Sequence, residues 1–342
     1  MTGKSVRDSN IELLRIVAMI LMLIDHAGYM SIQPPTQMEV NEEPLLSFCR
    51  FSSQALSSVC VNVFVLISGW FGIKIKLSRI VEFLSQCYFI CIVLYLGLLA
   101  MDYAIPMNTG DLLKFVLFDD LWFVKAFLLL YLFAPMLNLF VDNLLQRKFL
   151  WFVVAFAVIQ TVHGFFTQAP WFDKGQSPLT LMLLYLMGRY LRCYPCRFTK
   201  YSKKVDMMSY LLISLITAFL AFISVKYGAE GYRLFSYASP LLIMASVYFF
   251  LFFTKLSFRS SLVNWVAVSS FAVYVVNCEG HSWIIYTRII GNWWKTESIG
   301  TFVLYTIFAI VTVFIIAIVL DKIRYYSFKL VLRISSRDNG IH

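Results

Sequence analysis

The feature that most constrains this chain is a series of apolar segments, each about as long as a bilayer is thick. A membrane-spanning helix needs about 20 mainly apolar residues. The sequence is 60% hydrophobic and only 14% charged, with a mean hydropathy of +0.75, whereas soluble domains carry roughly a quarter charged residues. We therefore predict an all-α, polytopic integral membrane protein of about ten transmembrane helices. The predicted spans lie near 11–31, 56–73, 80–101, 121–141, 149–166, 178–194, 208–226, 235–253, 262–285 and 300–321.

The distribution of Lys and Arg predicts how the helices are oriented. Cytoplasmic segments are enriched in these residues. If the N-terminus is placed inside, 20 of the 29 Lys and Arg residues fall in internal segments, seven in external segments and two within spans. Both termini are therefore predicted to be cytoplasmic. The net charge of +10 is explained by these loops, so the sequence gives no reason to expect a nucleic-acid partner; the expected surroundings are the lipid bilayer.

No soluble domain fits between any two predicted spans. We expect one integral membrane domain over residues 1–342, with its core at 7–330 and a short basic cytoplasmic tail at 331–342. The stretch 102–120 contains four aspartates, which predicts an external loop. The seven cysteines are scattered and form no disulfide or metal-binding pattern, and Cys193 and Cys196 are interpreted as structural.

The first predicted span contains ionisable residues, which are costly inside a membrane and usually face a functional cavity. Arg15 and His26 are eleven residues apart, or three helical turns plus about 20°, so they share one face of the helix. A fixed cation and a titratable imidazole along one face suit a pathway that holds an anionic donor and then transfers a proton. Alternatively, Arg15 reaches the headgroups and His26 caps the helix end. Asp25 is interpreted as a solvated acid at the end of the helix.

Four motifs resemble the acyltransferase 3 family of integral membrane acyltransferases, in the same order along residues 7–330. The first is RDSNIELLRIVAMILMLIDH at 7–26, which places Arg15 and His26 at the family's Arg and His positions. The others are NVFVLISGWF at 62–71, LWFVKAFLLLYLFAP at 121–135 and SSFAVYVVN at 269–277. The chain departs from the family pattern at Lys76, where an Arg is usual, and at Asn277, where a His is common.

The resemblance implies transfer of an acyl group, most often acetyl from cytoplasmic acetyl-CoA, to a carbohydrate hydroxyl. The acyl-CoA is a donor substrate, and no permanently bound cofactor or metal is expected. Such a protein would reside in the plasma (inner) membrane of a bacterium and modify a cell-surface or exported glycan.

The family motifs also suggest roles for individual residues. His26 is the candidate general base and Arg15 the residue that orients the donor, while Lys74, Lys76 and Arg79 are candidates to bind the CoA phosphates. Weaker candidates for the acceptor site or for oxyanion stabilisation are Lys125, Trp122, Asn277, Glu279 and His281. Lys125 could instead pair with Asp25, and His281 is expected one turn beyond Asn277 on the same helix.

Two other classes of protein fit the same general pattern. A transporter or flippase for a polysaccharide precursor would explain the spans and the buried charges, although such folds usually contain repeated halves that this sequence lacks. A glycan polymerase would also be polytopic and directed at sugars, but we would expect it to carry a large, Arg-rich external loop. The longest external stretch, 32–55, contains only Arg50.

Overall fold

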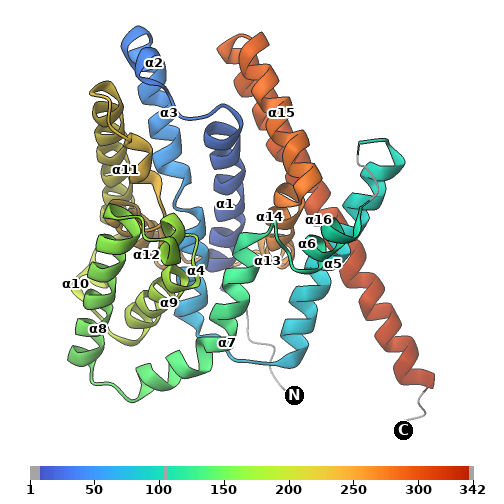
Figure 1. Ribbon diagram of the computed structural model, residues 1–342. Coiled ribbons are helices and arrows are strands. Elements are labelled where there is room, and N and C mark those ends of the chain that lie inside the picture. The colour runs from blue at the N-terminus through green and yellow to red at the C-terminus, as the bar shows by residue number, and fades with distance from the viewer. Residues whose placement is uncertain (1–7, 104–106, 339–342) are drawn as a thin grey trace.

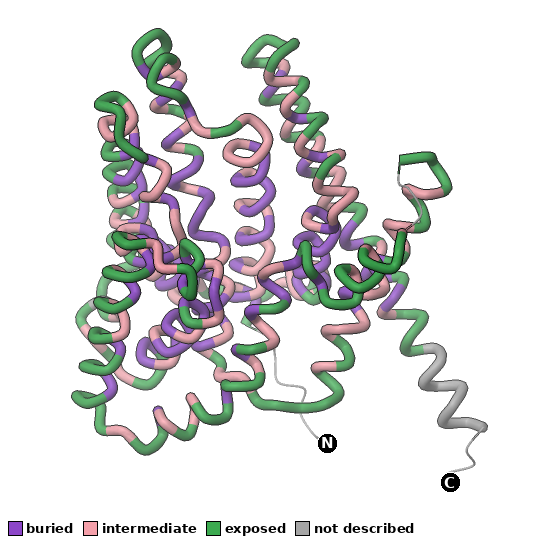
Figure 2. The backbone as a smooth tube through the Cα atoms, viewed as in Figure 1, coloured by how far each residue is buried: buried purple, intermediate pink, exposed green. Residues whose placement is uncertain are grey.

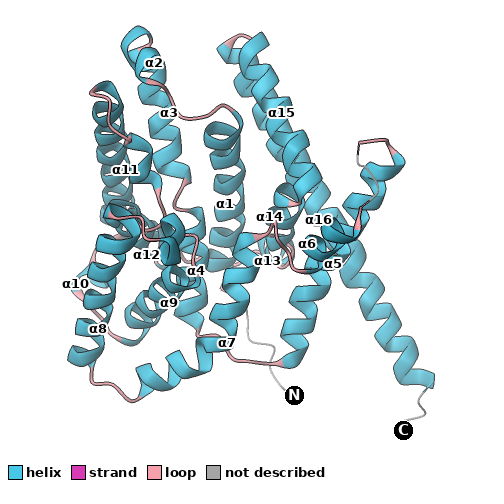
Figure 3. Cartoon of the chain, in the orientation of Figure 1, coloured by secondary structure: helices cyan, strands magenta, loops and turns pink. Residues whose placement is uncertain are grey.

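The computed structural model describes residues 8–103 and 107–338. In these ranges the chain is almost entirely helical and has no strand (Figure 3), which confirms the all-α prediction. Elements η1 and η2 are π-helical, and η3 and η4 are 3₁₀-helical. The elements are α1 (Ser9–Asp25), η1 (His26–Ser31), α2 (Gln37–Glu42), α3 (Pro44–Ser57), α4 (Cys60–Phe71), α5 (Leu77–Ala100), α6 (Thr109–Val116), α7 (Trp122–Asp142), α8 (Gln146–Ile159), η2 (Gln160–Phe166), η3 (Pro170–Gly175), α9 (Pro178–Cys193), α10 (Arg197–Lys200), α11 (Lys203–Lys226), η4 (Gly231–Phe235), α12 (Pro240–Thr254), α13 (Ser261–Ala267), α14 (Phe271–Cys278), α15 (Gly280–Thr296) and α16 (Ile299–Asp338).

Eight helical segments of the described chain are long and apolar enough to cross a membrane. They correspond to α3–α4, α5, α7, α8–η2, α11, η4–α12, α13–α14 and α16. The other two predicted spans, 11–31 and 178–194, fall on α1–η1 and α9, which are helical but have α-helical parts of only 17 and 16 residues. The protein is therefore a multi-pass membrane protein with additional shorter helices inside the bundle.

The outer surface of the bundle is apolar, as a lipid environment requires. Only 17% of the most apolar stretch of α16 is buried within the protein, compared with 67% for α3–α4. Figure 2 shows the same contrast, because buried residues concentrate on the central helices and exposed ones on the outer helices. The exposed faces carry large hydrophobic side chains such as Phe308 and Leu132, which lipid tails would cover.

Helices α4 and α9 form a very close crossing at two glycines. A Cβ atom on Gly69 would lie 2.2 Å from the carbonyl oxygen of Tyr185, and one on Gly188 would lie 2.5 Å from that of Leu66. Small residues allow helix backbones to approach closely in membranes, where van der Waals packing drives association. Gly69, near the end of the motif at 62–71, therefore serves close helix packing.

The predicted single span at 262–285 is wrong in one respect, because the helix breaks at Glu279. That residue has an extended backbone (φ −60°, ψ 134°), and its carboxylate accepts the Ser282 N–H at 2.9 Å, which caps α15. Gly280 follows, and a Cβ there would lie 2.7 Å from a carboxylate oxygen of Asp120. The break therefore places the start of α15 against the loop between α6 and α7.

The described chain begins and ends at the same end of the bundle. In Figure 1, α1 starts and α16 finishes on the lower side, whereas α2 and the far end of α15 lie on the upper side. The connection between α4 and α5 also lies on the lower side. This arrangement is compatible with the prediction of two termini on one side of the membrane. Helix α16 continues to Asp338, so much of the predicted tail at 331–342 is helical, and residues 339–342 lie outside the described residues.

Candidate active site

His26 lies where α1 changes from an α-helix to a π-helix. The α-helical part ends at Asp25, and η1 runs from His26 to Ser31. The Ser31 hydroxyl donates a hydrogen bond to the His26 carbonyl oxygen at 2.9 Å. Short π-helical turns are rare and occur often at functional sites. The widened turn presents the buried His26 side chain to the interior, a feature that the sequence pattern did not reveal.

The His26 ring is held by two residues from the other end of the chain. Its Nδ1 lies 2.6 Å from the Oδ1 atom of Asn277 on α14, and the Trp283 ring on α15 meets it edge to face, with 4.9 Å between ring centroids. When Nδ1 donates its proton to Asn277, the lone pair of a neutral imidazole is on Nε2. This arrangement leaves Nε2 as the nitrogen that can accept a proton.

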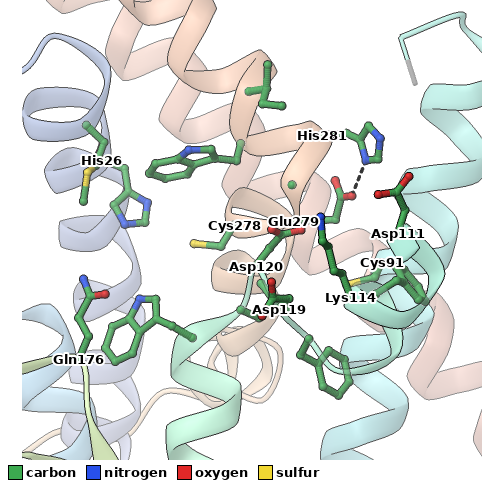
Figure 4. Close-up of a pocket in the computed structure, with 18 of the residues that line it drawn as sticks. His26, Cys91, Asp111, Lys114, Asp119, Asp120, Gln176, Cys278, Glu279 and His281 are labelled. Carbon is green, nitrogen blue, oxygen red and sulfur yellow. Dashed lines mark hydrogen bonds and ion pairs between the residues drawn. The ribbon is translucent and has the colours of Figure 1, made fainter. Parts of the chain in front are cut away.

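A large cavity opens beside His26 (Figure 4). Its volume is about 630 Å³, within the range of sites for small molecules. The lining comes from η1, the α6–α7 region and the α14–α15 junction, and includes Trp122, Glu279, His281 and Trp283. Four of the residues proposed from sequence therefore share one cavity: His26, Trp122, Glu279 and His281. We call this space the outer cavity.

One wall of the outer cavity is acidic. Glu279 is buried, and one of its carboxylate oxygens lies 2.9 Å from Nδ1 of His281, within hydrogen-bonding distance. Asp120 lies nearby, and burial together with the negative charge of Glu279 raises the pKa of its carboxyl group. Figure 4 shows Asp111 and Lys114 on the same side of the cavity. Asn277 and His281 are not successive turns of one helix, because the break at Glu279 separates them.

A second, narrow cavity of about 30 Å³ continues from His26 toward the other end of α1. It is mostly apolar, and its lining includes Met19, Phe64 and Tyr274. The Arg15 guanidinium lies 6.0 Å from the centroid of the Phe64 ring, a distance at which a cation interacts with an aromatic face. Arg15 does not line this inner cavity but lies beside Phe64, which does, and its Nε lies 3.9 Å from Glu12.

The two cavities share three lining residues, His26, Trp122 and Tyr237. The Trp122 and Tyr237 rings are stacked, with centroids 5.8 Å apart and planes inclined by 24°. Trp122 was proposed from sequence, whereas Tyr237 was not. Tyr237 lies in the short connection between η4 and α12, outside the four family motifs. No sequence pattern therefore singled it out.

Asp25 is not the solvated acid that the sequence suggested. Its carboxylate is buried and accepts hydrogen bonds on Oδ1 from Gln54 at 2.7 Å, Ser58 at 2.8 Å and, more weakly, Ser57 at 3.4 Å. All three donors are in the region of α3 and its C-cap. A buried carboxylate needs such partners, and here they fix the end of α1 next to His26. No sequence pattern pointed to these donors, because they lie about 30 residues away.

The suggested pairing of Lys125 with Asp25 is wrong. Lys125 Nζ instead lies 3.0 Å from the carboxylate of Asp119, in the loop before α7, and also donates to the Asp119 carbonyl oxygen. Lys125 does not line either cavity, although Asp119 lines the outer one. Its effect on the site is therefore indirect.

Lys74, Lys76 and Arg79 lie at the opposite end of the bundle from α2, on and after the α4–α5 connection (Figure 1). All three are exposed. The connection itself is fixed from α7, because the Tyr131 hydroxyl donates to the Lys74 carbonyl oxygen at 3.2 Å and accepts the Lys76 N–H at 3.1 Å. The basic residues are thus presented on an ordered backbone.

Further hydrogen bonds hold the start of this connection. The Ile73 N–H donates to the Tyr185 hydroxyl at 3.0 Å, and Asn138 Nδ2 donates to the Ile73 carbonyl oxygen at 2.8 Å. Tyr185 in turn donates to Asn138 Oδ1 at 2.6 Å. Gly72 has a φ of +72° and packs against the Arg189 side chain. The positive φ favours glycine, so the sharp turn after α4 depends on this residue.

Comparison with known proteins agrees with this architecture. A family model described as an acyltransferase domain matches residues 8–322, nearly the whole chain. No curated protein and no solved structure matches the chain. The described residues hold no cluster of His, Cys, Asp and Glu arranged to bind a metal ion. The match spans α1 through most of α16 and includes His26, Asn277 and the α4–α5 connection, and it shows that this membrane protein belongs to the acyltransferase 3 family.

Proposed function

We propose that this acyltransferase moves an acyl group, most simply acetyl, from cytoplasmic acyl-CoA to a hydroxyl group of a cell-surface or exported carbohydrate. The observation that carries this proposal is the position of His26. Its side chain lies at the junction of the outer and inner cavities, so a donor and an acceptor that enter from opposite sides of the membrane would meet beside it.

The donor would bind at the end of the bundle that carries the α4–α5 connection, which we assign to the cytoplasm. Lys74, Lys76 and Arg79 are exposed there, and cations of this kind bind phosphate groups. The apolar inner cavity would then receive the acyl end of the donor, and Arg15 beside Phe64 would supply positive charge along the route. Arg15 cannot act as a base because guanidinium groups stay protonated in proteins.

The acceptor would occupy the outer cavity. Its volume of about 630 Å³ accommodates a sugar residue, and the Trp122 and Trp283 rings offer apolar faces for stacking. Asp111, Asp119, Asp120 and Glu279 contribute carboxylates to the lining, against the cation of Lys114. This balance disfavours acceptors that carry many negative charges and favours uncharged sugars.

The chemistry follows from the orientation of His26. Nε2 would take the proton of the acceptor hydroxyl while the hydroxyl oxygen attacks the thioester carbonyl carbon. The tetrahedral intermediate would collapse with cleavage of the carbon–sulfur bond, and the CoA thiolate would receive the proton from the imidazolium. Asn277 would hold the ring through Nδ1 during both proton transfers.

Gene deletion with mass spectrometry of the cell's surface glycans tests the proposal. The deletion strain is expected to lack the mass of one acyl unit on a glycan, and the intact gene should restore it. His26→Ala should not restore the acyl group, because loss of a general base lowers the rate by at least about 100-fold. His163→Ala is the matched control, since His163 is exposed on η2 and should restore acylation fully. Unchanged glycans after deletion would contradict the proposed function, and full activity of the His26 variant would contradict the assigned base.

A further inference from the structure

Tyr237 occupies the same junction as His26. It lines both the outer and the inner cavity, and its ring stacks on Trp122. Any thioester that reaches Nε2 of His26 through the inner cavity would therefore pass beside the Tyr237 side chain.

The hydroxyl group of Tyr237 has no hydrogen-bond partner among the described residues. Three buried tyrosines of the bundle use their hydroxyls within the protein. Tyr286 donates to the Leu23 carbonyl oxygen at 3.0 Å, Tyr210 donates to that of Leu56 at 2.7 Å, and Tyr274 accepts the Phe123 N–H at 3.1 Å. The Tyr237 hydroxyl has no protein partner in the described part of the chain at the place where the half-buried ring lines both cavities, so it can donate a hydrogen bond to a ligand atom there.

The backbone around Tyr237 is fixed. Its carbonyl oxygen accepts a hydrogen bond from Asn62 Nδ2 at 3.4 Å. Gly175 packs directly against it, because a Cβ at that position would lie 2.7 Å from the Tyr237 Cβ and 2.5 Å from the Ala238 nitrogen. Gly175 has a φ of +94°, a conformation that also favours glycine. The Tyr237 ring is therefore held in place by its backbone and by Trp122.

We propose that the Tyr237 hydroxyl is the oxyanion donor of the transfer reaction, an inference that rests on the proposed function. As the acceptor oxygen forms its bond to the thioester carbonyl carbon, the carbonyl oxygen gains negative charge, and the Tyr237 O–H donates a hydrogen bond to it. The hydrogen bond weakens when the carbonyl re-forms and the carbon–sulfur bond breaks. Tyr237 loses no proton in this cycle, because His26 carries the proton from the acceptor hydroxyl to the CoA thiolate.

Tyr237→Phe tests this role, since it removes only the hydroxyl and keeps the ring that stacks on Trp122. The assay uses purified protein, labelled acetyl-CoA and the surface glycan extracted from the deletion strain, which lacks the acyl group. Loss of one oxyanion donor is expected to lower kcat by about 100-fold. The KM for the glycan and the Kd for acetyl-CoA should stay near those of the unmodified protein, because the hydrogen bond strengthens only as charge develops.

Tyr286→Phe is the matched control, because its hydroxyl bonds to a backbone carbonyl and lines neither cavity. It should lower the melting temperature in detergent and leave kcat close to that of the unmodified protein. A Tyr237→Phe protein that melts normally and keeps its kcat would overturn the role of Tyr237 while the acyltransferase proposal stands. Failure of the unmodified protein to label the glycan would instead contradict the proposed function.

If Tyr237→Phe does not fold, Gly175→Ala provides a second test. The added methyl group would displace Tyr237 and Ala238 by steric contact but leaves the hydroxyl present. The proposal predicts a fall in kcat with little change in acetyl-CoA binding, and an unchanged kcat in a folded Gly175→Ala protein whose melting temperature has fallen would argue against it.

Discussion

His26 and Asn277 are joined by a buried hydrogen bond of 2.6 Å between Nδ1 and Oδ1, although they lie 251 residues apart. The contact connects the first helix of the bundle to α14, and it determines which imidazole nitrogen faces the cavities. Asn277 stands where the family commonly has a second histidine. The amide oxygen can accept a hydrogen bond from the Nδ1–H group, and the amide itself does not titrate, so a single histidine remains at the junction to carry the proton.

Asn277→Ala should lower kcat by several-fold to about tenfold, which corresponds to the loss of one hydrogen bond. The KM for the glycan acceptor should change little, because Asn277 does not line the outer cavity. The measurement is the initial rate of acetyl transfer to glycan from the deletion strain. Asn292→Ala, on the exposed face of α15, is the control and should keep the full rate. A normal rate for Asn277→Ala would show that His26 needs no orienting partner.

Much of the fold was predictable because hydropathy reports directly on the lipid environment. Long apolar runs such as 80–101 and 208–226 correspond to α5 and α11 within a few residues. The break at Glu279 was not predictable, because Val276 to Trp283 contains no proline and the break depends on caps and contacts formed in three dimensions. Glu279 caps α15, while Gly280 allows the distant Asp120 to approach.

Part of the site was predictable, His26 and Trp122 from the family motifs and Glu279 and His281 from their place at the end of a predicted span. His26 stands out because an imidazole inside an apolar helix is unusual, and the structure places it between two cavities. Tyr237 and the donors to Asp25 gave no such signal. Aromatic and small polar residues are common in membrane helices, so their roles depend on which distant side chains they meet. Lys125 shows the opposite error, because the sequence suggested a role in the site that its contacts do not support. Its ammonium group pairs with nearby Asp119.

Gly69→Ala should weaken the crossing of α4 and α9. The new methyl group would lie 2.2 Å from the Tyr185 carbonyl oxygen, which is backbone and cannot rotate away. Overpacking of this kind typically costs about 1–3 kcal/mol. We expect a lower melting temperature in detergent and less folded protein in the membrane. Gly97→Ala on α5 is the matched control, because no atom lies within 4 Å of the added Cβ, and equal behaviour of the two variants would contradict the close packing.

Asp120→Asn should stabilise the protein at neutral pH. Burial and the adjacent Glu279 raise the pKa of Asp120 above its ordinary value, so the folded state disfavours the ionised carboxylate. This penalty is present above the raised pKa and disappears below the unfolded-state pKa. The gain in melting temperature should therefore be largest at about pH 8 and fade toward about pH 4, near the ordinary carboxyl value.

The matched control for Asp120 is its neighbour. Asp119→Asn removes the ion pair with Lys125 and one of the weaker causes of the raised Asp120 pKa, so any gain in melting temperature should be smaller than that of Asp120→Asn. If Asp120→Asn gave the same melting temperature as the unmodified protein at neutral pH, the carboxylate would not be under strain from its surroundings, and the description of this wall of the outer cavity would need revision.

The combined variant Lys76→Ala with Arg79→Ala should weaken acetyl-CoA binding by at least about tenfold, because hydrogen bonds to charged groups contribute about 1.5–3 kcal/mol each. Isothermal titration of acetyl-CoA into purified protein measures the effect, and higher salt should shrink it through screening. Arg147→Ala with Lys148→Ala removes the same charge from the exposed first turn of α8, so it separates specific contacts from general attraction. If both pairs weakened binding equally, the donor would sense only the net positive charge of this face. If neither did, the CoA phosphates would have to bind elsewhere, and the ordered α4–α5 connection would have a purely structural purpose.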